Sequence, residues 1–388
     1  MLELRYGTNP QQRPALARSA DGARLPVEVL AGRATAISLW NALVGWQLVR
    51  ELREAFGVQA AASVKHLSPV GAAIARPLQR EPAEGSAQDL RLSGLAAAYA
   101  RARGADRVAA FGDCAAFSDR VDGSTAELLA SEPSDAVIAP GYEPEALEVL
   151  RGKSDGRFVV FQVDPTFVPP AAERRELFGI TVEQPRNDER LTVELLRDTI
   201  ATEGHDLGDE LARDLLLATI AVRWAQSNAA AVALEGQLVG VGCGAQSRGE
   251  CMHAAVRKAQ LWHVRRHPAV RRLPFRDEVG QADRDYATDL YGRGDDSREL
   301  RGALRSLFTR EPEPLDSKAR DEWLEQLGEL ALSSDGLLRF RDAVACAAAA
   351  GVRAIAQPGG SARQGDVVAA ANAHGIVMSC HHVRLFMH

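Results

Sequence analysis

Apolar residues recur along this chain in two alternating patterns, one typical of amphipathic helices and one typical of buried strands. Residues 38–56 carry them at a three-to-four spacing, which predicts a helix that ends at Gly57. The short apolar run 59–64 predicts a buried strand that ends at the polar pair Lys65 and His66. The same alternation predicts a helix at 92–103 and strands at 108–111, 136–139 and 159–163. Such alternation is typical of an α/β fold whose sheet is covered on both faces.

The alternation starts again in the second half of the chain. It predicts helices at 210–224, 248–264 and 366–374, a hairpin of strands 229–234 and 237–241, and strands at 354–356 and 376–379. The stretch 267–314 is rich in charge, Pro and Gly, and a predicted amphipathic helix at 317–332 follows it. The polar stretch 183–190 is typical of a boundary between subdomains, so we expect one subdomain at 1–190 and another at 191–388. We also expect a helical segment, at about 265–330, inserted into the second subdomain.

Composition narrows the classes of function. The chain has 388 residues, of which 46% are hydrophobic and 25% charged, and its net charge is -6. A negative protein has no overall attraction for phosphate backbones or anionic lipids, so we expect it to bind neither nucleic acid nor membranes. Its apolar runs are too short for a membrane span and its N-terminus lacks a secretory pattern, which predicts a cytoplasmic protein. Five scattered cysteines without a C-x-x-C pair argue against a disulfide framework and a zinc site.

Lysine is rare in this sequence, since four Lys stand against 42 Arg among the 46 basic residues. One of the four, Lys65, lies beside His66 at the end of a predicted strand, where α/β sheets open their ligand sites. A His takes up a proton near neutral pH, and a Lys stabilises developing negative charge or delivers a proton, so the pair suits a group-transfer reaction. The alternative is purely structural, with His66 capping the strand and Lys65 in water.

Two glycine-rich segments are candidates for ligand contact. Residues 240–245 match a dinucleotide-binding fingerprint, but no acidic residue follows about twenty positions later, which favours a tight turn that directs residues 246–248 toward a ligand. The turn 358–362 before a helix can present backbone N–H groups to an anion. For both segments a plain structural turn is the alternative. Residues 380–382 alternate between strand faces and do not suit a metal site, and the basic run 265–272 suits solvated surface or a subunit contact.

Seven segments together resemble a known family along essentially the whole chain: residues 4–11, 63–71, 98–106, 138–142, 226–228, 246–248 and 384–388. In order and spacing they are similar to the AICAR transformylase domain of the bifunctional purine-biosynthesis enzyme that also carries IMP cyclohydrolase. The resemblance implies two cytidine-deaminase-like α/β/α subdomains without zinc, a homodimer, and active sites shared between its subunits. It also implies transfer of the formyl group of 10-formyltetrahydrofolate, the co-substrate, to the 5-amino group of AICAR, giving FAICAR. No redox cofactor is implied, and a structural monovalent cation such as K+ is compatible with the resemblance.

The resemblance assigns roles to residues by matching position. His66 looks like the general base and Lys65 like its partner, which polarises the formyl oxygen or protonates the folate nitrogen; Asn228 joins them from the other subunit, as Arg248 does. The positions similar to substrate-binding residues are Arg5, Tyr6, Gly112, Asp135, Arg248, Leu337 and Arg384. The positions similar to folate-binding residues are Gly249, Asp342, Ser361 and Ala362. No metal ligand is implied.

Departures from the family pattern modify these expectations. No cyclohydrolase domain precedes Arg5, so we expect a stand-alone transformylase that depends on a separate IMP cyclohydrolase. Ser38 and Asn41 replace an Asn and an Asp of the family's early helix. Other family residues, two aromatics, a Pro and an Asn, are replaced at Leu337, Leu338, Arg339 and Ala343. Because that stretch belongs to the pocket, one alternative is a folate-dependent formyltransferase for another aminoimidazole, and another is a catalytically silent protein that binds AICAR.

Overall fold

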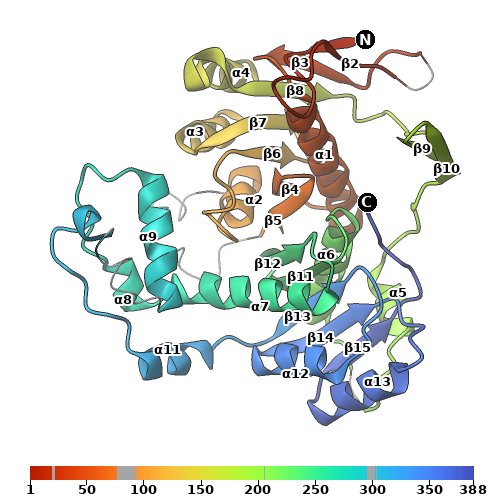
Figure 1. Cartoon of the computed structure of the whole chain (residues 1–388), viewed down its shortest axis with the longest axis vertical. Helices are drawn as coiled ribbons and strands as arrows, with labels where there is room; N and C mark the ends of the chain where they lie inside the picture. Colours follow the sequence, from red (N-terminus) through yellow and green to blue (C-terminus); the bar gives the residue numbers. More distant parts are fainter. Residues whose placement is uncertain (20–21, 77–91, 93, 205, 295–301, 303) are drawn as a thin grey trace.

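A single mixed sheet runs through the whole molecule. The computed structural model describes residues 1–388 except 20–21, 77–91, 93, 205, 295–301 and 303. In this part of the chain the sheet has 11 strands in the order β15-β14-β13-β11-β12-β5-β4-β6-β7-β8-β3 (Figure 1). They are β3 (Val27–Ala31), β4 (Ala60–Lys65), β5 (Ser68–Ile74), β6 (Asp113–Phe117), β7 (Ser134–Ala139), β8 (Val159–Val163), β11 (Ala229–Leu234), β12 (Gln237–Cys243), β13 (Leu330–Ser334), β14 (Val352–Gln357) and β15 (Val377–Cys380).

The strand pairing of the first half is repeated in the second. β4 pairs antiparallel with β5 and β6, and β6, β7 and β8 run parallel. Likewise β11 pairs antiparallel with β12 and β13, and β13, β14 and β15 run parallel. The halves meet where β12 pairs with β5, with Gln237 opposite Ala73. The predicted α/β class is confirmed, while the kinship to deaminases and the boundary at residue 190 stay predictions.

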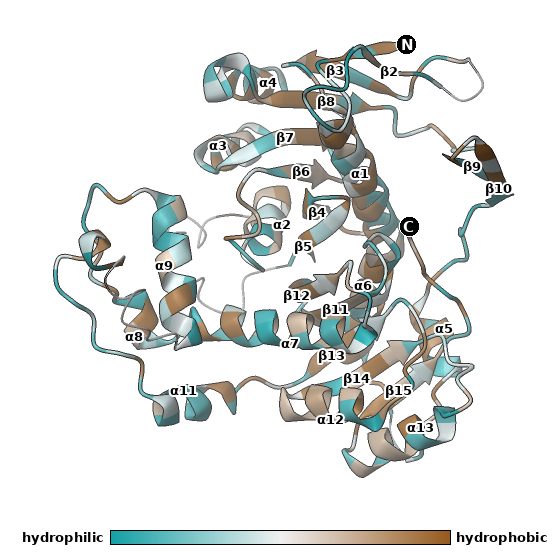
Figure 2. Ribbon diagram, viewed as in Figure 1, coloured by the Kyte–Doolittle hydropathy of each residue, from teal (hydrophilic) through white to brown (hydrophobic). Residues whose placement is uncertain are grey.

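Helices cover both faces of the sheet. α1 (Ala36–Phe56) and α6 (Asp209–Arg223) lie on one face, where they share a core with alternate residues of β4 and β11. α2 (Gly94–Arg103) covers the other face of the first half, and α7 (Arg248–Val264) covers that of the second. Figure 2 shows the strands between these helices mostly in the brown of hydrophobic residues. The remaining helices are α3 (Gly123–Ser131), α4 (Pro144–Gly152), α5 (Val193–Asp198), α8 (Pro268–Arg271), α9 (Gln281–Arg293), α11 (Ser317–Leu324), α12 (Arg341–Ala349) and α13 (Gln364–Ala373), with the 3-10 turns η2 (Lys153–Gly156) and η3 (Arg305–Leu307).

Local signals explain the two ends of α1. A capping box between Thr35 and Ser38 satisfies free N–H groups at its start, and Gly57 ends it with a left-handed φ of 70°. Ser38, which departs from the family pattern, therefore helps to cap the N-terminus of α1. Glycine also brings this helix close to the sheet, because a Cβ on Gly45 would lie 2.7 Å from the Cβ of Ala116.

Two sequence predictions are corrected by the structure, and one connection was not predicted. Residues 108–111 form a turn rather than a strand, and β6 begins only at Asp113. Phe111 in that turn is 52% exposed, so the apolar run does not mark a buried strand. The chain does not cross over after Lys65 but returns at once as β5, which the sequence analysis missed. The helix predicted at 317–332 ends at Leu324, and the chain then passes through Glu329, which has a left-handed φ of 58°, into β13.

Two peripheral parts extend from this body. The segment between α7 and β13 carries α8, α9 and α11 around a small core of its own, and an ion pair between Arg107 and Asp285 ties it to the first half at 2.8 Å. The hairpin of β9 (Ala172–Leu177) and β10 (Ile180–Pro185) stands away from the sheet with every residue exposed (Figure 1). A second small ribbon, of two strands, pairs β1 (Leu2–Leu4) with β2 (Ala15–Ala17).

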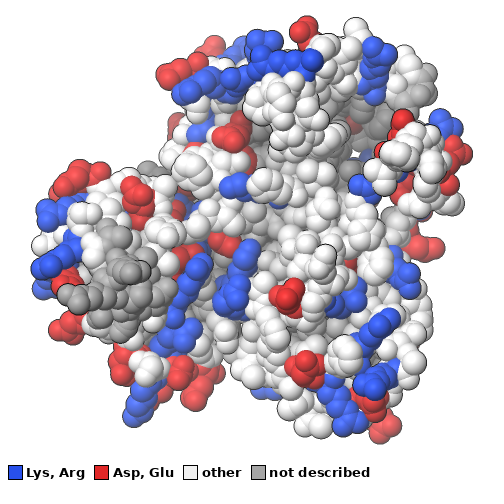
Figure 3. Space-filling model, viewed as in Figure 1, with Lys and Arg blue, Asp and Glu red and all other residues white. Residues whose placement is uncertain are grey.

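The surface and the helices bear on where this protein can act. Figure 3 shows basic and acidic side chains interspersed over the face that it draws, in keeping with the modest net charge of -6. No described helix is both long enough and apolar enough to cross a membrane.

Candidate active site

The β4–β5 turn presents the predicted catalytic pair. Lys65 is the last residue of β4 and pairs with Ser68, so His66 and Leu67 alone make the turn. Their φ angles are 51° and 58°, and positive φ at both central residues is typical of the tight turn that joins twisted antiparallel strands. Left-handed φ is uncommon for residues other than Gly, and it concentrates at functional sites. The turn leaves the His66 side chain exposed and the Lys65 side chain half-buried.

Two contacts from distant elements hold this turn. The buried Asn41 side chain of α1 accepts a hydrogen bond from the backbone N–H of Leu67, with a distance of 2.8 Å from N to Oδ1. At the start of β5, the hydroxyl of Ser68 accepts from the backbone N–H of Gln226 at 3.1 Å. The second contact joins the turn to the segment that carries Asn228, which lies in the other half of the sheet.

Lys65 connects the turn to two predicted substrate residues. Its ammonium group donates to the carbonyl of Phe111, directly before Gly112. Gly112 has a φ of 73°, and a Cβ there would lie 3.3 Å from Oδ2 of Asp135, so a larger residue would crowd that carboxyl. Burial raises the pKa of the Asp135 carboxyl, the Asp113 carboxyl adds to the rise, and the Lys65 charge opposes it. The structure thus brings Lys65, Gly112 and Asp135 together.

A buried charged network that the sequence analysis missed supports this corner. Arg103 donates to Oδ1 of Asp113 and to Oε2 of Glu132, each at 2.9 Å, and its side chain is only 2% exposed. The hydroxyls of Ser63 and Ser134 also donate to Asp113. Burial raises the pKa of Asp113, and Arg103 opposes that rise. Buried charges persist only when they are paired and hydrogen-bonded. The network therefore fixes the backbone at Asp113, directly after Gly112.

Arg5 and Tyr6 lie at the start of α1, the helix that carries Asn41. The backbone N–H of Arg5 donates to the backbone carbonyl of Ala34 at 2.7 Å. The backbone carbonyl of Tyr6 accepts from the N–H of Ala36 at 3.3 Å. The guanidinium groups of Arg5 and Arg13 lie 5.8 and 5.7 Å from the centre of the Tyr6 ring.

A second group of predicted residues surrounds Arg248, the first residue of α7. Its Nη2 donates to Oδ1 of Asn228 at 2.8 Å and to Oδ1 of Asp335 at 3.2 Å, while Nη1 donates to the carbonyl of Leu337 at 3.1 Å. The Asn228 amide in turn donates to the carbonyls of Ala245 and Gln246. Arg248 is therefore oriented by partners on two separate segments, 226–228 and 335–337, and the Asn228 amide is held by hydrogen bonds on both of its polar atoms.

Asp335, which the sequence analysis did not select, links this group to the C-terminal tail. Its side chain is fully buried and accepts from the Ser227 hydroxyl at 2.7 Å. Its carbonyl accepts from the N–H of Leu385 at 3.0 Å. The tail places the guanidinium of Arg384 5.1 Å from the Phe386 ring centre, with Arg248 5.7 Å from the same ring. Both guanidinium groups thus lie near the Phe386 ring.

Two neighbouring cavities lie along the segment 337–340, and Arg248 lines the larger of them. The larger, of about 680 Å³, is lined by Asn228, Arg248, Gly249, Leu337, Asp342 and Arg384 of the predicted residues, together with Gln246, Ser247, Met252, His253, Leu338, Arg339, Phe340, Ala343 and Phe386. The smaller, of about 430 Å³, is lined by Leu337, Arg339, Phe340, Gly360, Ser361, Ala362 and Arg363. Leu337, Arg339 and Phe340 line both, so the predicted nucleotide and folate positions of the second half are adjacent.

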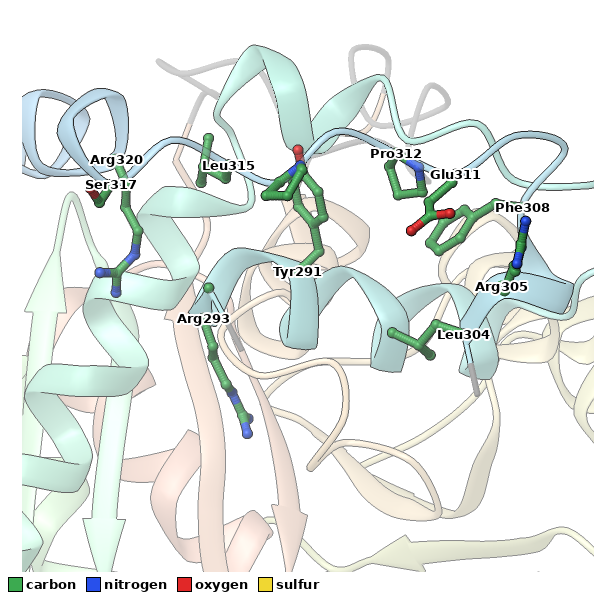
Figure 4. Close-up of a pocket in the computed structure, with 12 residues that line it drawn as sticks. Tyr291, Arg293, Leu304, Arg305, Phe308, Glu311, Pro312, Leu315, Ser317 and Arg320 are labelled. Carbon is green, nitrogen blue, oxygen red and sulfur yellow. The ribbon is translucent and has the colours of Figure 1, made fainter. Parts of the chain in front are cut away.

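A further cavity of about 390 Å³ lies in the segment between α7 and β13, and none of the predicted site residues lines it. Figure 4 shows the Tyr291 and Phe308 rings along it and the Arg293 side chain directed away from the other labelled side chains. Among the described residues, no group of three or more His, Cys, Asp or Glu side chains is arranged to hold a metal ion.

Comparisons with known proteins show which family the chain belongs to. A sequence model of the family described as "AICARFT/IMPCHase bienzyme" matches residues 1–258. The chain is similar to the bifunctional purine biosynthesis protein PurH of Roseobacter denitrificans, with 30% identity over 396 residues that cover 99% of this chain and 59% of the relative. It is 29% identical over 390 residues to PurH of Aquifex aeolicus, covering 100% of this chain and 60% of that protein. The chain thus spans about 60% of the length of these relatives. The family model covers well over half of the chain, and the chain therefore belongs to the AICARFT/IMPCHase bienzyme family.

Proposed function

We propose that this protein transfers the formyl group of 10-formyltetrahydrofolate to the 5-amino group of AICAR, giving FAICAR and tetrahydrofolate in purine biosynthesis. The observation that carries the proposal is the β4–β5 turn, which presents His66 exposed beside Lys65 and is held by Asn41 and Ser68. Family membership and the relatives' printed role in purine biosynthesis support the same reaction.

The proposed chemistry divides two proton movements between His66 and Lys65. The 5-amino group of AICAR is a weak nucleophile because its lone pair is delocalised into the ring. His66 takes a proton from that amine as its nitrogen attacks the formyl carbon. Lys65 stabilises the negative charge that develops on the formyl oxygen, or protonates N10 of the folate as the bond from the formyl carbon to N10 breaks. Formyl transfer is then balanced without oxidation or reduction.

The guanidinium groups around the larger cavity supply the charge for an anionic nucleotide. Arg248 and Arg384 line that cavity, and Arg5 lies on the N-terminal segment with its guanidinium 5.8 Å from the centre of the Tyr6 ring. A guanidinium offers forked donors that match phosphate geometry, which a protein of net charge -6 must provide locally. We assign the phosphate and carboxamide of AICAR to these cations, and the folate to Gly249, Asp342, Ser361 and Ala362.

We further propose a homodimer in which each active site draws on both chains. The candidate residues fall into a group around Lys65 and a group around Arg248, and one site would combine the first group of one chain with the second group of its partner. Large apolar side chains exposed on this chain are candidates for burial in such a dimer: Trp40 is 43% exposed, Phe111 is 52% exposed, and Phe178 at the tip of the β9–β10 hairpin is fully exposed.

The decisive assay follows tetrahydrofolate release from 10-formyltetrahydrofolate and AICAR, with and without added IMP cyclohydrolase. We expect turnover that rises with the cyclohydrolase, because removal of FAICAR pulls an unfavourable transfer forward. A kcat/KM for AICAR below about 1 M⁻¹s⁻¹, far under the usual enzyme range, would reject the proposal. Parallel assays in K+ and Na+ salts test the expected cation, and cell fractionation tests the expected cytoplasmic location.

Two alternatives rest on specific features. The changed stretch that includes Leu337 and Ala343 lines the larger cavity and favours a second candidate function, formyl transfer to another aminoimidazole. Competition between AICAR and other aminoimidazoles for the same enzyme separates the two. A catalytically silent AICAR-binding protein would bind AICAR without any transfer, yet binding alone has no need of a His beside a Lys.

A further inference from the structure

None of the described residues that line the cavity between α7 and β13 takes part in the proposed transfer. The volume of this cavity, about 390 Å³, falls in the range of small-molecule sites. Its walls come from α9, from η3 with the residues beside it, and from the stretch 311–320. The match to the family model ends at residue 258, before this segment begins. The proposed chemistry therefore leaves the cavity without a role.

The middle of the cavity is apolar and aromatic. The Tyr291 and Phe308 rings lie along it, with Leu304, Leu315 and Pro312 among the other apolar residues (Figure 4). Phe308 is only 4% exposed and belongs to the small core of this segment, so it is a fixed part of the wall. Aromatic rings pack well against other rings, and such a lining therefore suits the flat apolar body of a ring-containing ligand.

The two ends of the cavity differ in charge. Figure 4 shows Ser317 and Arg320 at one end, and Arg305 at the other end on the side of Glu311. Among the described lining residues Glu311 is the only acidic one, and it offsets the charge of Arg305. The Arg293 side chain is directed away from the others. The end at Arg320 is therefore the one that offers a positive charge without an acidic lining residue beside it.

Arg320 is held in a position that keeps most of its donors available. Its Nε donates to the carbonyl of Gly292 at 3.3 Å, and in the described part of the chain its two terminal nitrogens have no hydrogen-bond or ion-pair partner. The Tyr291 hydroxyl donates to the carbonyl of Glu313 at 2.7 Å, which ties α9 to the opposite wall. Since both walls are joined before a ligand enters, binding does not have to order them.

We propose that this cavity binds a small aromatic molecule that carries one carboxylate or sulfonate group. The rings of the ligand lie beside Tyr291 and Phe308, and its anionic group accepts hydrogen bonds from Arg320 and from the Ser317 hydroxyl. A guanidinium offers paired donors that match the oxygens of such a group, and a hydroxyl adds one more. The inference goes beyond the proposed function and does not depend on it, because binding here needs neither AICAR nor a folate.

The test uses two fluorescent probes with the same rings: anilinonaphthalene sulfonate, and phenylnaphthylamine, which lacks the sulfonate. We expect Arg320→Gln to raise the Kd of the sulfonate about fivefold and to leave the Kd of the amine within about twofold, as for loss of one charge contact. Lys318→Gln is the matched control, because this exposed cation of α11 pairs with Glu322 at 3.6 Å and does not line the cavity. It should leave both Kd values unchanged.

Filling the cavity tests the place of the rings. Leu315→Trp should weaken both probes by about tenfold or more, and circular dichroism with thermal unfolding shows whether the variant folds. Leu304→Trp narrows the cavity from the other wall and replaces Leu315→Trp if that variant does not fold. Equal losses in Arg320→Gln and Lys318→Gln, or undiminished binding in a folded Trp variant, would overturn the inference.

Competition separates this cavity from the proposed transfer site. Saturating AICAR or tetrahydrofolate should leave the Kd of the sulfonate unchanged, and displacement of the probe by either would place it in the transfer site and reject the inference. Wild-type protein that binds neither probe would reject it as well, and would leave the proposed function standing. Sulfonate binding that depends on Arg320, in a protein that transfers no formyl group to AICAR, would support the cavity site and reject the proposed function.

Discussion

Asn41 and Leu67 are joined by a hydrogen bond that ties the first long helix to the turn bearing His66. The donor is the backbone N–H of Leu67, the acceptor is Oδ1 of a side chain that is 6% exposed, and they lie 2.8 Å apart. The bond stabilises two successive residues with left-handed φ, a conformation that costs L-amino acids about 1–2 kcal/mol each. Asn41 is thus a positioning residue for His66.

Removing this bond should disturb catalysis more than substrate binding. We expect Asn41→Ala to lower kcat by about tenfold, since a buried unpaired N–H costs about 1–3 kcal/mol and the turn would relax to avoid it. Asn41→Asp keeps an acceptor oxygen and should restore most of the loss. Steady-state kinetics of both variants check this, and equal losses in the Ala and Asp variants would contradict a role as acceptor.

His66 itself should matter for the chemical step. We expect His66→Ala to lower kcat by about 10² or more, the usual scale for loss of a general base, with a smaller change in AICAR affinity. Single-turnover kinetics and AICAR binding measure the two effects separately. Near-normal turnover in this variant would remove His66 from the mechanism.

Shared sites predict rescue between inactive variants. Mixing Lys65→Ala with Arg248→Ala subunits at random should restore about a quarter of wild-type activity, because half of the dimers are mixed and each mixed dimer keeps one intact site. Mixing Lys65→Ala with His66→Ala is the control and should restore nothing, since both residues belong to the same group. If subunits exchange and the first mixture stays inactive, the sites are not shared.

The buried pair of Arg103 and Asp113 should matter for stability. Arg103→Met leaves Asp113 and Glu132 without their partner, and we expect the free energy of unfolding to fall by about 3–5 kcal/mol. Adding Asp113→Asn should recover part of that loss. Denaturant unfolding measures both, with Arg50→Met as a control because its pair with Glu54 is exposed and worth less than about 1 kcal/mol.

The buried imidazole of His381 should make the stability of the fold depend on pH. Burial lowers the pKa of its imidazole to about 4, with His382 and Arg223 contributing, and the side chain is 1% exposed. At pH values between about 6.5, the ordinary pKa of His, and about 4, the unfolded chain therefore binds more protons than the folded chain. Full stability is present above pH of about 6.5 and is lost as pH falls toward 4, by about 3 kcal/mol in all.

Unfolding curves at several pH values test this dependence. In His381→Asn the loss between pH 7 and pH 4.5 should shrink relative to wild type, because the titrating ring is gone. His382→Gln is the matched control, since His382 is exposed, and it should keep most of the wild-type slope. An unchanged slope in His381→Asn would show that other groups set the acid sensitivity.

Local pattern was sufficient for much of the fold. The apolar spacing predicts α7 with the bounds that the structure has, and the hairpin of β11 and β12 follows from two apolar runs around Glu235 and Gly236. The pair Lys65 and His66 was located because Lys is rare here and because a buried strand ends beside it. Caps, turns and periodicity act over a few residues, so the sequence by itself determined these elements and the first candidates for the chemistry.

Other features depend on residues far apart in the chain. The left-handed turn at His66 and Leu67 is held in place by Asn41, and the position of Arg248 depends on Asp335, 87 residues away. The cavity between Arg339 and Arg363 exists only once β13 and β14 pair and bring the two segments together. Strand pairing and packing set these distances, and no local pattern encodes them. The tertiary structure alone therefore decided how the candidate residues are grouped, which ones orient them, and where the cations remain unpaired.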